Sequence, residues 1–539
     1  MSSFNGQKER DLTPIKGKAF VYDYSYDFTT WDGITDSYLI VRNYDKTKKE
    51  YAHNEINLRT NEWLPKEGMG DESKEYTTLK IPGDNDNQLK ITCEFNNGEN
   101  AEIYRQNWET KKETLIFKVA KNRQFIPQFV SADGSILYGL SNHTTKTLCP
   151  VALNLKSGQL KVLYKDNDYD VLYNEPGEEK PLCDFGTSKP LMVQYYAKKF
   201  KSAGINSKVK KALKEVKAKL GCEEVRVLDI SPDLNEYTLQ REQADFGGNK
   251  YTYNLRTKKL VCIETHEIDY ASGDLRVYAR PISYLSRDGL KIEGYLTLPD
   301  TGKPLENLPT VVYVHGGPWN RDFWNPDSDV GFLASRGYAV LQINFRGSAG
   351  YGREFLEKGD KQWGAKMQDD ITDGTNWLIN KGIADKDRIA IYGWSYGGYA
   401  AFCGLTFTPK LYACGISCCG ISDLVSDLEN MRNRNNALTK QYFHHVGDLG
   451  ADVKKLKKTS PAYHLDKIER PLFVVQGAAD SNVNRKQSDK VVNALRKRGA
   501  KVEYMVREGE GHGFRKPQNL RDFYMRLEEF LAKHLKPSK

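Results

Sequence analysis

The stretch Gly393-Trp394-Ser395-Tyr396-Gly397 lies between an apolar run, residues 388–392, and a segment of small residues that starts at Gly397. A strand that passes through a tight turn directly into a helix holds the central serine clear of the backbone. Flanking glycines are needed there because a Cβ atom would clash in so tight a turn. The N–H group of Tyr396, at the start of the helix, would then point to where an oxyanion forms. The stretch therefore predicts a nucleophile elbow with Ser395 as the nucleophile, although the five-residue pattern alone is common.

Two further segments follow in the order that the acid and the histidine take in α/β hydrolases. Asp480 comes after the apolar run 471–476, and His512 lies in a glycine-rich loop after the apolar run 502–506. The carboxyl ends of parallel strands share one edge of a sheet, so both side chains are expected at the edge that carries Ser395. The separation of 85 residues (480 − 395) leaves room for one more strand and its helices, and that of 32 residues (512 − 480) for one helix and one strand.

A fourth segment lies upstream, where the apolar run 310–314 ends in His315-Gly316-Gly317-Pro318. Lipases and esterases use such a glycine-rich loop for the second oxyanion donor, which points to the N–H of Gly317 beside that of Tyr396. His315 is expected to hold this loop through hydrogen bonds. Each segment alone fits an ordinary turn, a strand-end carboxylate or a loop histidine. The four in this order favour acyl transfer by a Ser-His-Asp triad.

Charge and length exclude several classes of protein. The 539 residues include 80 Lys and Arg against 71 Asp and Glu, a net charge of +9. This length favours two domains. Basic and acidic residues alternate, which indicates a solvated surface rather than a nucleic-acid-binding face. The most basic segment, residues 208–220, has apolar residues at helical spacing, and we expect it to pack as an amphipathic helix in preference to binding a membrane surface.

Cysteine and histidine spacing gives no sign of a metal or disulfide framework. The nine cysteines show no repeated Cys-x-x-Cys pairing, and no His-Glu-x-x-His pattern is present, so we expect no metal and no cofactor. Residues 2–11 are polar and no run approaches 18 apolar residues. These features predict a cytoplasmic protein with reduced thiols and no membrane segment.

The region 16–268 reads as short strands separated by turn residues, with one recurring phrase. Four phrases of the type Asn-Leu-Arg-Thr start at Asn57, Asn107, Asn154 and Asn254, at offsets of 50, 47 and 100 residues (107 − 57, 154 − 107, 254 − 154). The last offset is twice the period, as if the lysine-rich helix had replaced the phrase of one unit. A repeat of this length made of four short strands is typical of a β-propeller, with about five blades recognisable.

The sequence pattern changes near residue 280. Beyond it, predicted strands and helices alternate as in a doubly wound α/β sheet. We therefore expect a β-propeller over residues 1–275 and an α/β-hydrolase catalytic domain over residues 280–539. A propeller that lacks blades would leave an open edge strand, which favours pairing of two copies into a homo-oligomer.

Several phrases of the second half together resemble the hydrolase domain of the prolyl oligopeptidase family of serine peptidases, close to its acylaminoacyl-peptidase and dipeptidyl-peptidase branch. These phrases are residues 280–284, 315–319, 344–352, 368–370, 393–400 and 510–514. The resemblance implies a propeller that covers the active site and admits short peptides only. Two departures stand out: Asn482 occupies the place of an arginine common in relatives, which leaves the substrate contacts of that arginine in doubt, and relatives tend to have a longer N-terminal part.

The expected activity is hydrolysis of short peptides through an acyl-enzyme on Ser395. Two alternatives stay open. A carboxylesterase uses the same triad on the same fold, and a propeller scaffold would carry the hydrolase only as an inactive remnant. The residues that bind substrate, the side-chain preference and the choice between exo- and endopeptidase do not follow from the sequence.

Overall fold

The computed structural model describes residues 23–25, 38–45, 50–57, 63–65, 75–81, 84, 86–93, 100–107, 109–171, 189–242, 248–265, 278–299, 305–325, 327–432 and 437–535. The chain divides into two compact units, residues 1–74 and 75–539. In the first unit, four antiparallel strands form one sheet in chain order. They are β1 (Asp23–Ser25), β2 (Tyr38–Asp45), β3 (Glu50–Asn57) and β4 (Trp63–Pro65).

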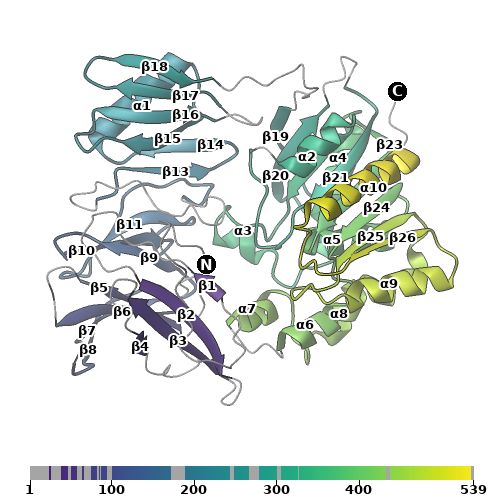
Figure 1. The fold of residues 1–539 in the computed structure, drawn as a ribbon, viewed down its shortest axis with the longest axis horizontal. Helices are drawn as coiled ribbons and strands as arrows, with labels where there is room; N and C mark the ends of the chain where they lie inside the picture. The colour runs from purple at the N-terminus through teal and green to yellow at the C-terminus, as the bar shows by residue number, and fades with distance from the viewer. Residues whose placement is uncertain are drawn as a thin grey trace, which may run out of the picture. The chain divides into compact units, whose positions relative to one another are not determined.

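The second unit begins with more antiparallel sheets of the same kind (Figure 1). The first holds β5 (Glu75–Lys80), β6 (Asn87–Cys93), β7 (Glu102–Asn107) and β8 (Glu113–Lys118). The next holds β9 (Phe125–Val130), β10 (Ile136–Ser141), β11 (Cys149–Asn154) and β12 (Leu160–Val162). A pair, β13 (Met192–Tyr196) and β14 (Phe200–Gly204), precedes a sheet of β15 (Val225–Ile230), β16 (Glu236–Arg241), β17 (Lys250–Asn254) and β18 (Lys259–Glu264).

The recurring asparagine phrase occupies the same place in each four-stranded sheet that contains it. Asn57, Asn107, Asn154 and Asn254 each end the third strand of their sheet. In the second unit, Oδ1 of each asparagine accepts a hydrogen bond from the amide three residues later, at 2.8 to 3.0 Å. A side chain that binds its own turn in this way favours a hairpin. The prediction that the phrases mark equivalent turns is therefore confirmed for Asn107, Asn154 and Asn254, whereas the turn after Asn57 lies outside the described residues.

The lysine-rich segment forms helix α1 (Ser207–Leu220), as predicted. The helix starts at Asn206, whose side chain accepts a hydrogen bond from the Lys208 amide, and ends at Gly221, where φ is +62°. Its apolar face, Val209, Ala212, Leu213 and Val216, is buried against the strands β15 to β17. Burial of this face leaves the lysines outside and favours the packed helix over the membrane-surface alternative.

The last part of the chain forms an α/β domain. Its described residues include one eight-stranded sheet, in the order β19-β20-β22-β21-β23-β24-β25-β26 (Figure 1). Its strands are β19 (Tyr278–Leu285), β20 (Lys291–Leu298), β21 (Leu308–Val314), β22 (Ala339–Asn344), β23 (Ala384–Trp394), β24 (Cys414–Cys418), β25 (Leu472–Gly477) and β26 (Val502–Arg507). β19 and β20 form an antiparallel hairpin that turns at Gly289, where φ is +83°. The other strands, β22, β21, β23, β24, β25 and β26, run parallel to one another.

Helices cover both faces of this sheet. They are α2 (Ser328–Ser335), α3 (Arg353–Glu357), α4 (Lys366–Asn380), α5 (Tyr396–Phe407), α6 (Leu424–Arg432), α7 (Ala437–His445), α8 (Val453–Thr459), α9 (Lys486–Lys497) and α10 (Pro517–Leu535). Apolar side chains of α4, α5, α6, α8 and α9 share one buried core, and those of α2 and α10 share another on the opposite face. Between Ser395 and Asp480 lie α5, β24, α6 to α8 and β25, the strand that leads to Asp480, and between Asp480 and His512 lie α9 and β26. The room for one more strand and its helices, and for one helix and one strand, is therefore used as the two separations predicted.

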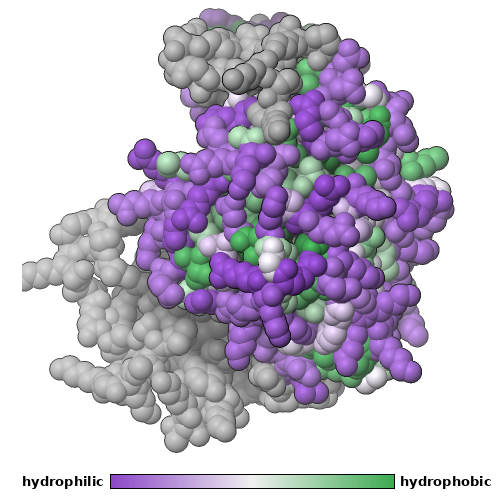
Figure 2. All heavy atoms as spheres, turned by 90° about the vertical axis from the view of Figure 1, so that its right-hand side faces the viewer, coloured by the Kyte–Doolittle hydropathy of each residue, from purple (hydrophilic) through white to green (hydrophobic). Residues whose placement is uncertain are grey.

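The expected boundary between the halves, residues 275–280, falls partly on residues 266–277, outside the described residues. Among the helices that the structure describes, none is long and apolar enough to cross a lipid bilayer. On the face in Figure 2, hydrophilic side chains cover most of the coloured surface and hydrophobic residues form small separate patches. This distribution agrees with the solvated surface expected from the mixed charges.

Candidate active site

Ser395 occupies a strained turn between β23 and α5. Its backbone has φ 58° and ψ −116°, a conformation that non-glycine residues rarely adopt. The flanking glycines are required by close packing, because a Cβ atom on Gly393 or Gly397 would lie 2.5 Å or 2.0 Å from the carbonyl oxygen of Val314. The clash expected at both positions is therefore confirmed, and the turn has the geometry of a nucleophile elbow.

Asp480 and His512 meet at the ends of two neighbouring strands. Nδ1 of His512 lies 2.8 Å from Oδ2 of Asp480, and the Asp480 side chain is fully buried while that of His512 is 25% exposed. Oδ1 of Asp480 accepts hydrogen bonds from the amides of Asn482 and Val483, at 2.8 and 2.9 Å. Burial disfavours the charged carboxylate, but the hydrogen bonds from His512 and from the two amides outweigh it and lower the pKa of Asp480. The carboxylate is thus built to stay ionised beside the imidazole.

The serine–histidine contact of the predicted triad is not formed in this structure. Within the described residues, Ser395 Oγ makes no hydrogen bond with the His512 ring. Free enzymes often have long serine–histidine contacts that shorten only when substrate binds. The structure therefore joins Asp480 with His512 directly and places Ser395 at the turn after β23, which is separated by β24 alone from β25, the strand that leads to Asp480.

The predicted oxyanion donors lie on two loops that pack together. A Cβ atom on Gly316 would be 3.5 Å from Cβ of Ser395, which places the loop of residues 315–318 directly beside the elbow. Gly317 has φ +116° and is exposed, and Tyr396 is the first residue of α5. In the described part of the chain, neither backbone N–H group has a hydrogen-bond acceptor. Both donors are therefore available to a ligand.

His315 holds this loop, as predicted. Its Nδ1 lies 2.8 Å from the carbonyl oxygen of Gly316 and its Nε2 lies 2.9 Å from Oγ of Ser348. The ring stacks on Phe345 with a centroid separation of 4.4 Å. Burial lowers the pKa of His315 to about 4, so the ring stays neutral at neutral pH.

Three residues around the pair were not singled out from the sequence. Gln476 donates a hydrogen bond to Oδ2 of Asp480 at 3.2 Å, and Cys419 lies beside Asp480 and His512. Glu510 accepts hydrogen bonds from the amides of Arg515 and Lys516 and from the side chain of Asn519, which fixes the loop that carries His512. For Glu510 the signal was present, since it lies two residues before the histidine.

The residues at the departure from the family pattern also have partners. The amide of Asn482 donates to Asp480, as described above. Nε of Arg485 lies 3.4 Å from Asp489, and its Nη1 lies 3.7 Å from Glu508. Arg485 thus pairs with two carboxylates of the protein itself.

A mostly parallel sheet with a serine elbow after a central strand, and an acid–histidine pair at two neighbouring strand ends, defines an α/β-hydrolase domain. Comparison with known families agrees: residues 324–538 match the model described as the prolyl oligopeptidase family. This part of the chain is a prolyl oligopeptidase family domain.

Two curated relatives extend the similarity beyond this domain. Dipeptidyl aminopeptidase BIII of Pseudoxanthomonas mexicana is 32% identical over 419 residues, which are 76% of this chain and 59% of that protein. Dipeptidyl peptidase family member 6 of Caenorhabditis elegans is 32% identical over 337 residues, which are 58% of this chain and 45% of that protein. The chain thus spans about half to three fifths of the length of these relatives.

Solved structures show the same fold at lower identity. A puromycin-hydrolyzing peptidase of Mycobacterium tuberculosis superposes with a TM-score of 0.73 at 19% identity, covering 96% of this chain and 80% of that one. An acylaminoacyl peptidase of Pyrococcus horikoshii gives a TM-score of 0.65 at 19% identity, covering 93% of this chain and 80% of that one. The fold, a strand-rich N-terminal region followed by an α/β domain, is therefore shared with peptidases.

Proposed function

We propose that this protein is a serine peptidase that hydrolyses short peptides, of the acylaminoacyl-peptidase or dipeptidyl-peptidase type, with Ser395, His512 and Asp480 as its triad. The observation that carries the proposal is the buried Asp480 carboxylate held against His512 at the strand ends beside the Ser395 elbow. The family domain and the peptidase relatives support the reaction class.

The proposed reaction follows the triad mechanism. His512 takes the proton of the Ser395 hydroxyl as Oγ attacks the carbonyl carbon of the substrate. Asp480 holds the imidazole with its proton on Nδ1, and the amides of Gly317 and Tyr396 donate hydrogen bonds to the oxyanion. The leaving amine receives the proton from His512, and water then hydrolyses the acyl ester on Ser395.

The restriction to short peptides rests on the strand-rich region acting as a propeller that covers the site. Hydrogen bonds between this strand-rich region and the α/β domain support the role of the region as a cover. The Arg321 guanidinium donates to the carbonyl oxygens of Tyr196 and Ala197, at 3.3 and 3.1 Å, and the Tyr169 hydroxyl donates to Glu293 at 2.6 Å. Arg321 is 2% exposed, so these contacts are buried. Such contacts favour a fixed cover over a loosely tethered one.

A fluorophosphonate probe tests the nucleophile. We expect labelling of the intact protein at Ser395 alone and none in Ser395→Ala. Labelling that persists in Ser395→Ala would refute the assignment, and an unlabelled wild-type protein would favour the inactive scaffold.

A substrate panel tests the reaction class. Aminoacyl, acyl-aminoacyl and dipeptidyl chromogenic amides are compared with a simple ester of the same chromophore. Cleavage of the amides that disappears in Ser395→Ala supports the peptidase. Cleavage of the ester alone would support the carboxylesterase instead.

A further inference from the structure

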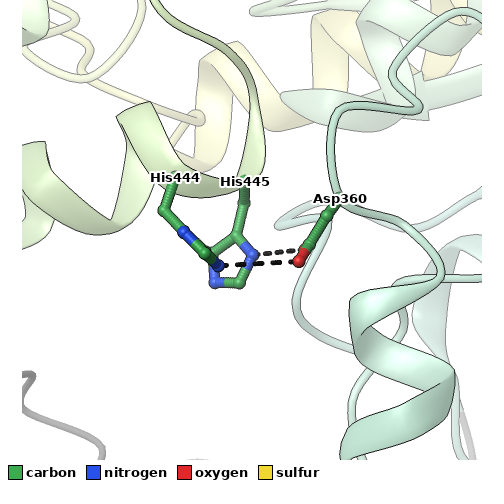
Figure 3. A group of neighbouring side chains, drawn as sticks. All are labelled: Asp360, His444 and His445. Atoms are coloured by element: carbon green, nitrogen blue, oxygen red, sulfur yellow. Dashed lines mark hydrogen bonds and ion pairs between the residues drawn. The ribbon is translucent and has the colours of Figure 1, made fainter. Parts of the chain in front are cut away.

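Two histidines and one carboxylate meet outside the predicted triad. His444 and His445 end α7, and Asp360 lies in the loop between α3 and α4 (Figure 3). Nδ1 of His445 is 2.5 Å from Oδ1 of Asp360, and Nε2 of His444 is 3.6 Å from Oδ2 of the same carboxylate. Figure 3 shows both imidazole rings turned toward this carboxylate, which lies on the facing loop.

This donor set is suited to a transition-metal ion. One atom from each of the three groups lies within 4.8 Å of the other two. Zinc bonds to histidine nitrogen and carboxylate oxygen are about 2.0–2.2 Å long, so ligand atoms around a tetrahedral ion are about 3.3 Å apart. The 3.6 Å pair already fits this spacing, and the 2.5 Å pair needs an opening of less than about 1 Å.

The Asp360 carboxylate has the two histidines as its charged or polar side-chain partners, and no basic side chain of the described residues competes for it. Lys361 follows Asp360 directly, but its ammonium group pairs with Asp452 at 2.8 Å. Among the described residues, the Asp360 carboxylate pairs with no lysine or arginine. A carboxylate and imidazole nitrogens are all potential ligands of a cation, and two neutral rings with one carboxylate would reduce the charge of a divalent ion to about +1.

Exposure and backbone contacts make the site accessible and partly preformed. The His445 side chain is 6% exposed, that of Asp360 is 24% exposed and that of His444 is 55% exposed. The Lys361 amide donates to the carbonyl oxygen of His445 at 2.6 Å, which ties the loop to the end of α7. An ion could enter from the side of His444 and keep water at its remaining position, as in open zinc sites.

We propose that Asp360, His444 and His445 bind one divalent transition-metal ion of the zinc class. The site lies one packed side chain from the predicted oxyanion loop. The His445 ring contacts Trp319, with centroids 5.1 Å apart, and Trp319 follows Pro318 directly in that loop. The ion takes no part in the acyl-transfer steps proposed above, and the proposal does not depend on them.

The test must separate this site from a second one. Cys419, Asp480 and His512 also come within metal-binding distance of one another. Zinc binding is therefore measured by titration calorimetry on full-length His512→Ala, which removes the second site. To this protein we add His444→Ala or Asp360→Asn, and, as a matched control, His464→Ala, which removes a histidine elsewhere in the domain. The exposed position of His444 keeps its replacement compatible with folding.

The expected result is one Zn²⁺ bound per chain by His512→Ala and by the His464→Ala control. Loss of a ligand in His444→Ala or Asp360→Asn should weaken binding by at least about tenfold, the loss seen even for groups one step removed from a metal. Equal affinity in all four proteins, or no binding to His512→Ala, would overturn the proposal.

Cobalt gives a second readout that needs no activity. Co²⁺ held by nitrogen and oxygen donors lacks the thiolate charge-transfer band that Cys419 would produce. We expect wild-type protein with one equivalent of Co²⁺ to show ligand-field bands without the thiolate band, and these bands to disappear in His444→Ala. A dominant thiolate band that is unchanged in His444→Ala would assign the ion to Cys419 and refute the site.

Discussion

Gly477 packs so closely on Gly511 that a Cβ atom at position 477 would lie 2.0 Å from the Gly511 carbonyl oxygen. Gly511 precedes His512, so the end of β25 acts as the support of the histidine loop. We expect Gly477→Ala to displace His512 and to lower kcat/KM about 100-fold, the loss typical of a 1 Å misplacement. The control is Gly511→Ala, since a Cβ atom there meets nothing within 4 Å. Equal kcat/KM for the two variants would contradict this role of Gly477.

Asp480 fixes the tautomer of His512 in the proposed mechanism. Asp480→Asn should retain the fold but lower kcat by about 10⁴-fold, because the amide favours the wrong tautomer. The rate is measured on the best amide substrate of the panel. Asp466→Asn changes an exposed carboxylate of the same domain and should leave kcat unchanged. A loss below tenfold in Asp480→Asn would argue against its place in the triad.

The lowered pKa of Asp480 also has a consequence for stability at acid pH. A carboxyl group whose pKa is lower in the folded state stabilises that state above its unfolded pKa, about 3.9, and loses this contribution as pH falls through the folded pKa. The difference in Tm between wild type and Asp480→Asn should therefore be constant from neutral pH to about pH 5 and shrink below about pH 4. A difference that grows as pH falls would have the wrong sign for this linkage.

Cys419 should be inert in the folded protein although it lies beside the predicted triad. Burial raises its pKa to about 12, and the reactive species is the thiolate. Treatment with iodoacetamide at neutral pH, followed by peptide mass spectrometry, should modify the exposed Cys262 and leave Cys419 unmodified until the protein unfolds. Modification of both thiols at similar rates would show that the site opens to the reagent.

A buried ion pair supports the sheet end near the site. The side chains of Arg346 and Asp370 are 4% and 0% exposed and lie 2.7 Å apart. Arg346→Met leaves the carboxylate buried without its cation and should lower the free energy of unfolding by about 3–5 kcal/mol. Arg287 binds Asp369 and Asp373 nearby but is 51% exposed, so Arg287→Met should cost about 1 kcal/mol or less. The two variants are compared by urea unfolding, and similar costs would contradict the effect of burial.

Much of the candidate site could be predicted from the sequence because each part depends on local geometry. The glycines around Ser395 follow from contacts with one strand, and the separations of Asp480 and His512 follow from the alternation of strands and helices. The asparagine phrases at Asn107, Asn154 and Asn254 are equally local, since each of these side chains binds an amide three residues later. Such features survive as spacing in the chain.

Other features depend on which distant segments pack together. Asp360 and His445 are 85 residues apart, and nothing in the spacing of either residue indicates their contact. Nothing in the sequence distinguishes Cys419 from the other eight cysteines. Its place near Asp480 follows from the sheet order, in which β24 lies beside β25. The sequence by itself determined the elbow, the order of the predicted triad and the strand repeats, because short-range sterics and hydrogen bonds produce them. Only the tertiary structure decided the neighbours of Asp480 and the histidine cluster, because these contacts arise from the packing of a whole sheet and its helices.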